Sequence, residues 1–391
     1  MYKYDEIEAV HLEMTEACNA SCPMCARNLN GGEVNPYLHN NELTIDDIKK
    51  IFAIDFVQQL KRIYMCGNYG DPAVARDTLE AFKYFREHNE KLLLSMHTNG
   101  SMKKPEWWAE LARVINGRGY VVFSIDGLKD TNHLYRQGTV WKTIMKNVEA
   151  FIKAGGRARW DFIVFAHNEH QVEEAEQLSK DMGFEKFQYK KSARFFSNTR
   201  GATKQEHQAQ NRKKVTTLLQ APTNPKYRNA VLDKLATVAT VKNTNVITVD
   251  NIISVDKLPE IQGVQRFSLD IDKKKPMEKV WDESTIDCKV AKEKNVYVTA
   301  EGVLQPCCWT AGQMYIWYYK PKGAQIWQYI DQVGVDNLNA KNHSMESIIN
   351  GDFFQTVIPE SWDKDSCANG KNAVCAKTCG TKFDAYSEQF K

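Results

Sequence analysis

The chain has 391 residues, of which 42% are hydrophobic, which is enough for a folded core and argues against wholesale disorder. Its 52 basic and 49 acidic residues leave a formal net charge of +3, so composition gives no electrostatic case for a nucleic-acid or membrane partner. No apolar run reaches the roughly 18 residues of a membrane-spanning helix, and the charged start MYKYDEIEAVHLEM lacks the apolar core of a secretion signal.

Short apolar runs alternate with amphipathic stretches over the first half of the chain. The clearest amphipathic stretch places Ile144, Val148 and Phe151 on one face of a helix that two glycines close. A second helix is expected from about His170 to Met182. The predicted strands are Ala9–Met14, Arg62–Cys66, Leu92–His97, Tyr120–Ile125, Asp161–Phe165 and Lys186–Tyr189. Because parallel strands need helical crossovers, this alternation predicts an α/β fold with six β/α units in a partial, open barrel.

The sequence divides into three regions. Residues 1–197 are predicted to form the partial (β/α)6 barrel. Residues 198–280 begin with a polar stretch. The part that follows, through Lys275, contains three prolines and strand-like pieces such as Asn245–Val249, so a bridging element or an insertion is expected here. Residues 281–391 carry cysteines again and predict a second, small α+β domain with a β-hairpin.

The ten cysteines fall into two groups separated by a long interval. They are Cys18, Cys22, Cys25 and Cys66, followed by Cys288, Cys307, Cys308, Cys367, Cys375 and Cys379. Because no secretion signal is predicted, we expect a cytoplasmic protein, and disulfides are rare in that compartment. Ligation of a metal ion or an iron–sulfur cluster is the better explanation for so many thiols.

Three of these thiols lie in one eight-residue loop directly after the first predicted strand, Cys18-Asn-Ala-Ser-Cys22-Pro-Met-Cys25. A four-iron cluster usually takes four cysteine thiolates, so three ligands leave one iron open to chelate a small molecule. A single zinc ion with a fourth ligand such as His11 is the alternative interpretation.

The CX3CX2C spacing of this loop resembles the radical S-adenosylmethionine (SAM) superfamily. The resemblance implies a four-iron, four-sulfur (4Fe-4S) cluster with Cys18, Cys22 and Cys25 as its ligands and with SAM bound to the free iron. It further implies reductive cleavage of SAM to methionine and a 5′-deoxyadenosyl radical, which abstracts a hydrogen atom from a substrate. The cofactors supply this chemistry, while the protein orients them and excludes water.

Polar segments at the ends of later predicted strands resemble the parts of the superfamily that hold SAM. The second strand runs into Gly67-Asn68-Tyr69-Gly70-Asp71, which is similar to the GGE-type motif except that Asp71 replaces a glutamate and Asn68 a glycine. In related enzymes a serine and an arginine hold the SAM carboxylate. The SAM-binding residues implied by the resemblance are Gly67, Asn68, Gly70, Asp71, Asn99, Ser124 and Arg136. Cys66 is expected to be a small buried residue rather than a ligand.

The second cysteine group resembles the SPASM and twitch domains of radical SAM enzymes, which bind auxiliary iron–sulfur clusters. Val296–Cys307 predicts a β-hairpin that turns at Glu301-Gly302, and its spacing is similar to the CX9–15GX4C opening of those domains. The resemblance implies one auxiliary cluster, expected to be 4Fe-4S, or a structural zinc ion in its place. The implied ligands are Cys288, Cys307 and Cys379, with Cys375 ahead of Cys367 as the fourth.

Cys308 directly follows a predicted ligand. It is either a spare buried thiol or a catalytic residue. Related maturases carry a functional acid at this place, and a thiol there would return a hydrogen atom to a substrate radical. Cys308 is therefore the catalytic candidate of the chain.

SPASM and twitch relatives mostly modify ribosomally made peptides or proteins. The resemblance thus implies a radical SAM oxidoreductase that acts on a peptide, with dehydrogenation of a small molecule such as a sugar or nucleotide as the alternative. The predicted barrel starts close to Met1, so a peptide substrate would need a separate recognition protein or residues 198–280. An electron donor such as flavodoxin or ferredoxin is expected as a partner. A zinc- or iron–sulfur-stabilised binding protein is the non-enzymatic alternative.

Overall fold

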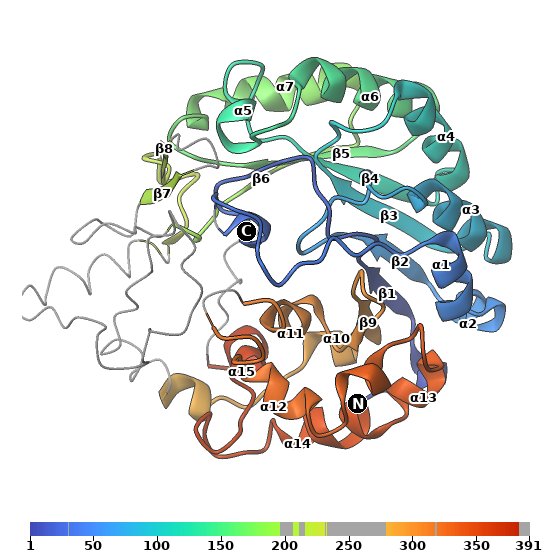
Figure 1. Cartoon of the computed structure of the whole chain (residues 1–391). Helices are drawn as coiled ribbons and strands as arrows, with labels where there is room; N and C mark the ends of the chain where they lie inside the picture. The colour runs from blue at the N-terminus through green and yellow to red at the C-terminus, as the bar shows by residue number, and fades with distance from the viewer. Residues whose placement is uncertain are drawn as a thin grey trace, which may run out of the picture.

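A computed structural model describes the chain over residues 1–29, 31–195, 206–210, 216–230, 232, 279–316 and 319–382. The strand expected at Asn245–Val249 lies outside these residues, as does most of the region 198–280. Figure 1 shows one continuous sheet with helices along its outer side and the C-terminal segment packed near its first strand. None of the helices among the described residues has the length and apolar character needed to cross a bilayer.

The main sheet has eight strands in the order β10-β9-β1-β2-β3-β4-β5-β6 and does not close into a barrel. The strands are β1 (Ala9–Leu12), β2 (Arg62–Met65), β3 (Leu93–Thr98), β4 (Gly119–Ser124), β5 (Ala158–Ile163), β6 (Lys186–Lys190), β9 (Asn295–Val298) and β10 (Leu304–Gln305). Strands β1 to β6 are all parallel. The predicted partial barrel of six β/α units is therefore confirmed.

Strand β5 begins three residues earlier than the sequence predicts. The charged side chains of Arg159 and Asp161 interrupt the apolar run there and hide the alternation of buried residues around Trp160. Trp160 is fully buried, and its indole N–H donates to the Ile125 carbonyl at 2.8 Å. The register is therefore fixed by a side chain on the core face of the sheet.

Helices cover one face of the sheet (Figure 1). They are α1 (Ile45–Ile51), α2 (Ile54–Gln59), α3 (Thr78–His88), α4 (Pro105–Ile115), α5 (Asn132–Tyr135), α6 (Trp141–Lys153) and α7 (Val172–Met182). The predicted apolar face of α6 is found, because Phe151 packs against Phe123 of β4 at a ring distance of 5.9 Å. Helix α7 ends at Gly183, whose φ of 86° closes the helix in the left-handed conformation.

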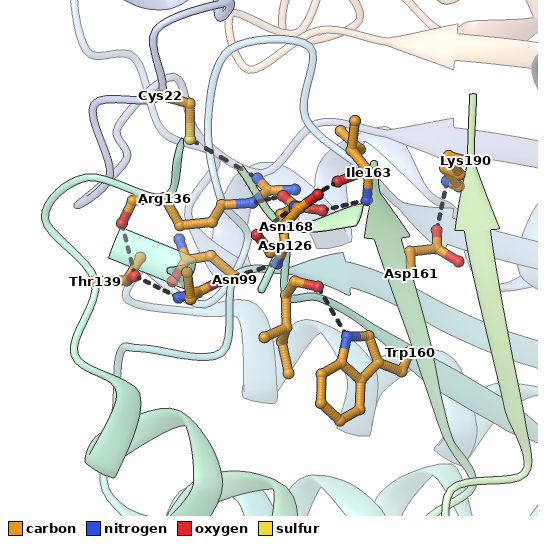
Figure 2. A network of polar contacts seen from close by, with 12 residues as sticks. Cys22, Asn99, Asp126, Arg136, Thr139, Trp160, Asp161, Ile163, Asn168 and Lys190 are labelled. Atoms are coloured by element: carbon orange, nitrogen blue, oxygen red, sulfur yellow. Dashed lines mark hydrogen bonds and ion pairs between the residues drawn. The ribbon is translucent and has the colours of Figure 1, made fainter. Parts of the chain in front are cut away.

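The opposite, concave face of the sheet is polar. His11 lies between the rings of Tyr64 and Tyr297, with ring distances of 4.3 and 4.6 Å. Asp161 and Lys190 form an ion pair on the neighbouring strands β5 and β6 (Figure 2). Since side chains alternate between the two faces of a strand, the apolar residues face the helices and these polar residues line the inside of the open barrel.

The predicted hairpin is present, and it continues the barrel sheet. Strand β9 pairs in parallel with β1, and β10 returns antiparallel to β9. The turn contains Gly302 at a φ of 93°, a conformation that glycine adopts without strain. The hairpin therefore covers the edge of β1, which an isolated six-strand sheet would leave unpaired.

The remaining C-terminal residues are mainly helical and share a core with the barrel. Their helices are α10 (Lys289–Lys292), α11 (Cys308–Gln313), α12 (Ile326–Ile330), α13 (Met345–Ile349), α14 (Ile358–Glu360) and α15 (Ala373–Cys379), with a π-helical turn at Phe353–Val357. Buried residues such as Ile330 and Phe353 belong to the same apolar cluster as Val10 and Ile63 of the first strands. A separate two-stranded pair is formed by β7 (Glu206–Gln210) and β8 (Thr216–Gln220).

Candidate functional site

The loop that carries Cys18, Cys22 and Cys25 leaves the C-terminal end of β1. All three cysteines pack against one small apolar cluster. Its other members include Ala20, Met24, Tyr135, Phe165, Phe195, Leu219, Ala221 and Leu232. His207 of β7 contacts the Pro23 carbonyl through Nε2 at 2.7 Å. The cysteine loop is therefore held between the barrel and the β7–β8 pair.

Arg136 lies directly beside this loop. Its Nε is 2.5 Å from Oδ2 of Asp126, and its Nη1 lies 3.8 Å from the Cys22 sulfur (Figure 2). Asp126 is fully buried and also accepts the Ile163 backbone N–H at 2.6 Å. Burial raises the pKa of Cys22 to about 11, and the charge of Arg136 opposes this shift. Asp126 thus fixes a cation against a predicted cluster ligand.

Asn99 is a second N–H donor at the same loop. Its Nδ2 donates to Oδ1 of Asn19 at 2.8 Å and lies 3.9 Å from the Cys18 sulfur. Ser124 ends β4 and is half-buried. The structure therefore brings Arg136 and Asn99 to the cysteine loop.

The Asp71 carboxylate is bound by other groups of the protein. Its carboxylate accepts hydrogen bonds from the Thr98 hydroxyl at 2.8 Å and from the backbone N–H groups of Asn99 at 2.7 Å and Ala73 at 2.9 Å. Burial raises the pKa of Asp71. The carboxylate therefore joins the ends of β2 and β3, and it supports the predicted SAM-binding loop from within.

The segment Gly67–Gly70 packs closely against neighbouring backbone. A Cβ atom on Gly70 would lie 1.7 Å from the Thr15 carbonyl oxygen, so any side chain there would push the loop away from the cysteine loop. The Asn68 side chain donates to the Cys308 carbonyl at 2.8 Å, and the Tyr69 hydroxyl donates to the Gly312 carbonyl at 3.1 Å. Asn68 therefore reaches α11 of the C-terminal segment.

Glu13 is a buried residue that the sequence prediction missed. Its Oε1 accepts the backbone N–H groups of Tyr69 at 2.8 Å and Gly70 at 3.2 Å, and its Oε2 accepts the Tyr297 hydroxyl. Burial raises the pKa of Glu13 to about 7. A carboxylate within the apolar strand VHLEM is the signal that could have identified it, because unpaired charges are rarely buried.

Four cysteines of the second group line one cavity. They are Cys288, Cys307, Cys375 and Cys379, surrounded mostly by apolar side chains. The thiols of Cys288 and Cys379 lie close enough to interact with each other. Cys367 is not among the lining residues, and its backbone N–H is bound to Asp282 at 2.6 Å. The cavity therefore gathers the three firmest predicted ligands together with Cys375.

Cys308 begins α11 and faces a second pocket beside this cavity. The pocket is also lined by His11, Tyr64, Tyr297 and Trp309, so it joins the inside of the barrel to the cysteine cavity. Cys66 is half-buried, at the end of β2.

His11 does not join the three cysteines of the first loop. Its Nε2 contacts the Cys66 carbonyl, and burial lowers its pKa to about 3, so the ring is neutral. Among the described residues, no three histidine, cysteine or acidic side chains lie close enough to hold a single metal ion. A single zinc ion, with zinc–sulfur bonds of about 2.3 Å, would hold its cysteine sulfurs almost in contact with one another. A 4Fe-4S cluster lies between its cysteine sulfurs and keeps them farther apart.

Residues 12–179 match the family model of the radical SAM superfamily. The chain contains a radical SAM domain. The match runs from the last residue of β1 through β5 to most of α7 and includes the cysteine loop. No curated protein matches the chain significantly.

Two solved structures with TM-scores of 0.50 or more share the fold of the radical SAM domain and of the segment that follows it. One is anSMEcpe with bound AdoMet, at a TM-score of 0.51 and 14% identity, covering 98% of this chain and 89% of that one. Another is native anSMEcpe with bound AdoMet and the Kp18Cys peptide, at a TM-score of 0.50 and 14% identity, with coverages of 98% and 92%. SuiB from Streptococcus suis bound to S-adenosylmethionine reaches a TM-score of 0.48 at 14% identity, with coverages of 94% and 76%.

The donors at the cysteine loop fit the cluster of a radical SAM domain. Cluster thiolates carry negative charge, and N–H groups near sulfur stabilise it. Arg136 and Asn99 present such groups to Cys22 and Cys18, from loops that Asp126 and Asp71 hold in place. These donors would therefore stabilise the negative charge of a cluster bound to the loop.

The buried carboxylate predicts a specific pH dependence of stability in the radical SAM domain. Because folding raises the pKa of Glu13 from 4.5 to about 7, its contribution to stability is complete below pH 4.5 and is lost as the pH rises through 7. The loss amounts to about 3 kcal/mol in all, of which about 1 kcal/mol falls between pH 6 and 8.

Glu13→Gln keeps an acceptor for Tyr69 and Gly70 but does not titrate. From pH 6 to pH 8, the free energy of unfolding of the wild type should decrease by about 1 kcal/mol more than that of Glu13→Gln. Anaerobic denaturant titrations at the two pH values measure this difference. The exposed Glu173 provides a control, because Glu173→Gln should retain the wild-type slope. An unchanged slope in Glu13→Gln would contradict the assignment.

Proposed function

We propose that this chain is a radical SAM enzyme with one auxiliary iron–sulfur cluster, and that it abstracts a hydrogen atom from a ribosomally made peptide or protein. The observation that carries the proposal is the presence of two separate cysteine sets. Three thiols follow β1, next to the Arg136 and Asn99 donors, and four more line an apolar cavity of the C-terminal segment.

The first set would hold the 4Fe-4S cluster through Cys18, Cys22 and Cys25. When bound, this cluster and SAM supply the 5′-deoxyadenosyl radical. The loop at Gly67 and Gly70 and the end of β4 at Ser124 would contact SAM. Arg136 would orient the cluster loop and meet the SAM carboxylate, whereas Asp71 and Asn68 would act mainly by fixing the loop, because their side chains already bind protein groups.

The second set would hold the auxiliary cluster through Cys288, Cys307, Cys375 and Cys379. Four thiolates are the usual ligand set of a 4Fe-4S cluster. The apolar lining of the cavity would keep water from these sulfurs. An electron donor of the flavodoxin or ferredoxin type would reduce the first cluster.

Cys308 would serve as the catalytic thiol. It lines the pocket that reaches His11 and Tyr64 inside the barrel. Transfer of the hydrogen atom from its S–H group to a carbon-centred substrate radical forms a C–H bond and leaves a sulfur radical. One electron from the donor and one proton from solvent restore the thiol.

A peptide is the favoured substrate class. Both anSMEcpe structures have this fold, and one of them contains a bound peptide. Oxidation of a small molecule is the alternative. The two hypotheses are distinguished by whether a peptide or a small molecule raises the rate of 5′-deoxyadenosine formation above its basal value.

The radical activity is tested with SAM and dithionite under anaerobic conditions. We expect the reconstituted wild type to form 5′-deoxyadenosine, detected by mass spectrometry, and to hold about eight irons. The triple variant Cys18→Ala, Cys22→Ala, Cys25→Ala should form none and retain about four irons. A wild type that forms no 5′-deoxyadenosine and holds mainly zinc would instead indicate a zinc-stabilised binding protein.

The fourth auxiliary ligand is tested by two single variants. Cys375→Ala should lose the auxiliary cluster and retain about four irons, because it removes a thiol from the cavity. Cys367→Ala is the matched control and should retain about eight. Iron analysis with electron paramagnetic resonance (EPR) measures both. Loss of iron in Cys367→Ala alone would assign Cys367 instead.

The role of Cys308 is tested in D2O, where its S–H exchanges to S–D. With a peptide that stimulates 5′-deoxyadenosine formation, the wild type should return deuterium to the peptide. Cys308→Ala should still cleave SAM but return none, whereas Cys66→Ala should behave as wild type. Deuterium in the peptide from Cys308→Ala would rule out this role.

A further inference from the structure

Trp362 has a buried N–H group without a partner. The residue follows α14, and its indole Nε1 makes no hydrogen bond to any described residue of the chain. An unpaired buried donor destabilises the folded state, and folded proteins rarely contain one. An unpaired buried donor of this kind indicates an acceptor that becomes available when a group from outside the chain binds, because binding of such a group can turn a neighbouring thiol into a thiolate.

The position of Trp362 indicates which partner this is. Trp362 lines the same cavity as Cys288, Cys307, Cys375 and Cys379. Its indole N–H lies close to the Cys375 thiol, although the two form no hydrogen bond of normal geometry. The donor is therefore next to one of the four sulfurs of the proposed auxiliary cluster.

The hydroxyl groups in this lining are already committed to the backbone. The Thr310 hydroxyl donates to the Cys307 carbonyl at 2.8 Å and also lies 3.6 Å from the Cys307 sulfur, and the Thr378 hydroxyl donates to the Val374 carbonyl at 2.6 Å. Among the described lining residues, Trp362 is the one whose buried side-chain donor is left over.

We infer that Trp362 donates its indole N–H to the Cys375 thiolate of the auxiliary cluster and thereby raises the reduction potential of that cluster. The inference rests on the proposed function, because it needs the cluster in this cavity. The positive end of the N–H dipole stabilises the extra negative charge of the reduced cluster, and the apolar lining strengthens this effect. Trp362 is thus a positioning residue that makes the auxiliary cluster a better electron acceptor.

Trp362→Phe tests the inference, because it removes the N–H and keeps an aromatic ring. Trp281 provides the matched control, since its Nε1 is also buried without a partner but lies outside the cavity lining. Both changes are made in the Cys18→Ala, Cys22→Ala, Cys25→Ala background, so that EPR-monitored redox titration reports the auxiliary cluster alone.

We expect Trp362→Phe to shift the midpoint potential to a more negative value at unchanged iron content, and Trp281→Phe to leave it unchanged. Equal potentials at four irons would overturn the role of Trp362 and leave the proposed function intact. A background variant without any cluster would overturn both the auxiliary cluster and this inference.

A measurement without a tryptophan substitution covers the case in which Trp362→Phe fails to fold. In the same background, electron–nuclear double resonance should detect a proton coupled to the auxiliary cluster that exchanges in D2O with the rate of a buried N–H. Absence of any such coupling would overturn the inference.

Discussion

One buried carboxylate connects the parts of this molecule on which its chemistry depends. Glu13 extends from the end of β1 and binds the backbone of the loop at Tyr69 and Gly70 on one side and the hydroxyl of Tyr297 on the other. The first contact belongs to the predicted SAM site, and the second belongs to the hairpin that leads to Cys307. Asn68 adds a direct bond from the same loop to α11. The two cysteine sets are thus joined through hydrogen bonds and do not simply lie on neighbouring domains.

The two faces of the sheet differ in polarity. Apolar residues of the strands meet the helices, whereas His11, Tyr64 and the ion pair of Asp161 with Lys190 face the inside of the open barrel. Placing charged groups there has a desolvation cost, which a hydrophobic lining would avoid. A polar interior would suit a substrate held between the two proposed cofactor sites, and the pocket at Cys308 shares lining residues such as Cys307 and Trp309 with the cysteine cavity.

Local spacing predicted much of the fold and the site. The six strands, the helices α6 and α7 and the hairpin at Gly302 follow from periodicity and turn residues within short windows. What the sequence could not show depends on contacts between distant residues. The pairing of β9 with β1 joins segments almost 290 residues apart. Spacing favoured Cys375 over Cys367, but which of the two lines the cavity is visible only in the structure. Glu13 was missed because its partner Tyr297 lies 284 residues away.

The pairing of β9 with β1 has a consequence for dividing the chain. A fragment ending near residue 197 would keep every strand from β1 to β6, yet it would expose the backbone of β1 over residues 9–12 together with the apolar surface that the C-terminal helices cover. An uncovered strand edge next to apolar surface is a template for pairing between molecules. Truncation at the predicted domain boundary near residue 197 would therefore expose this edge. A shortened protein that stays in solution would have to retain the hairpin.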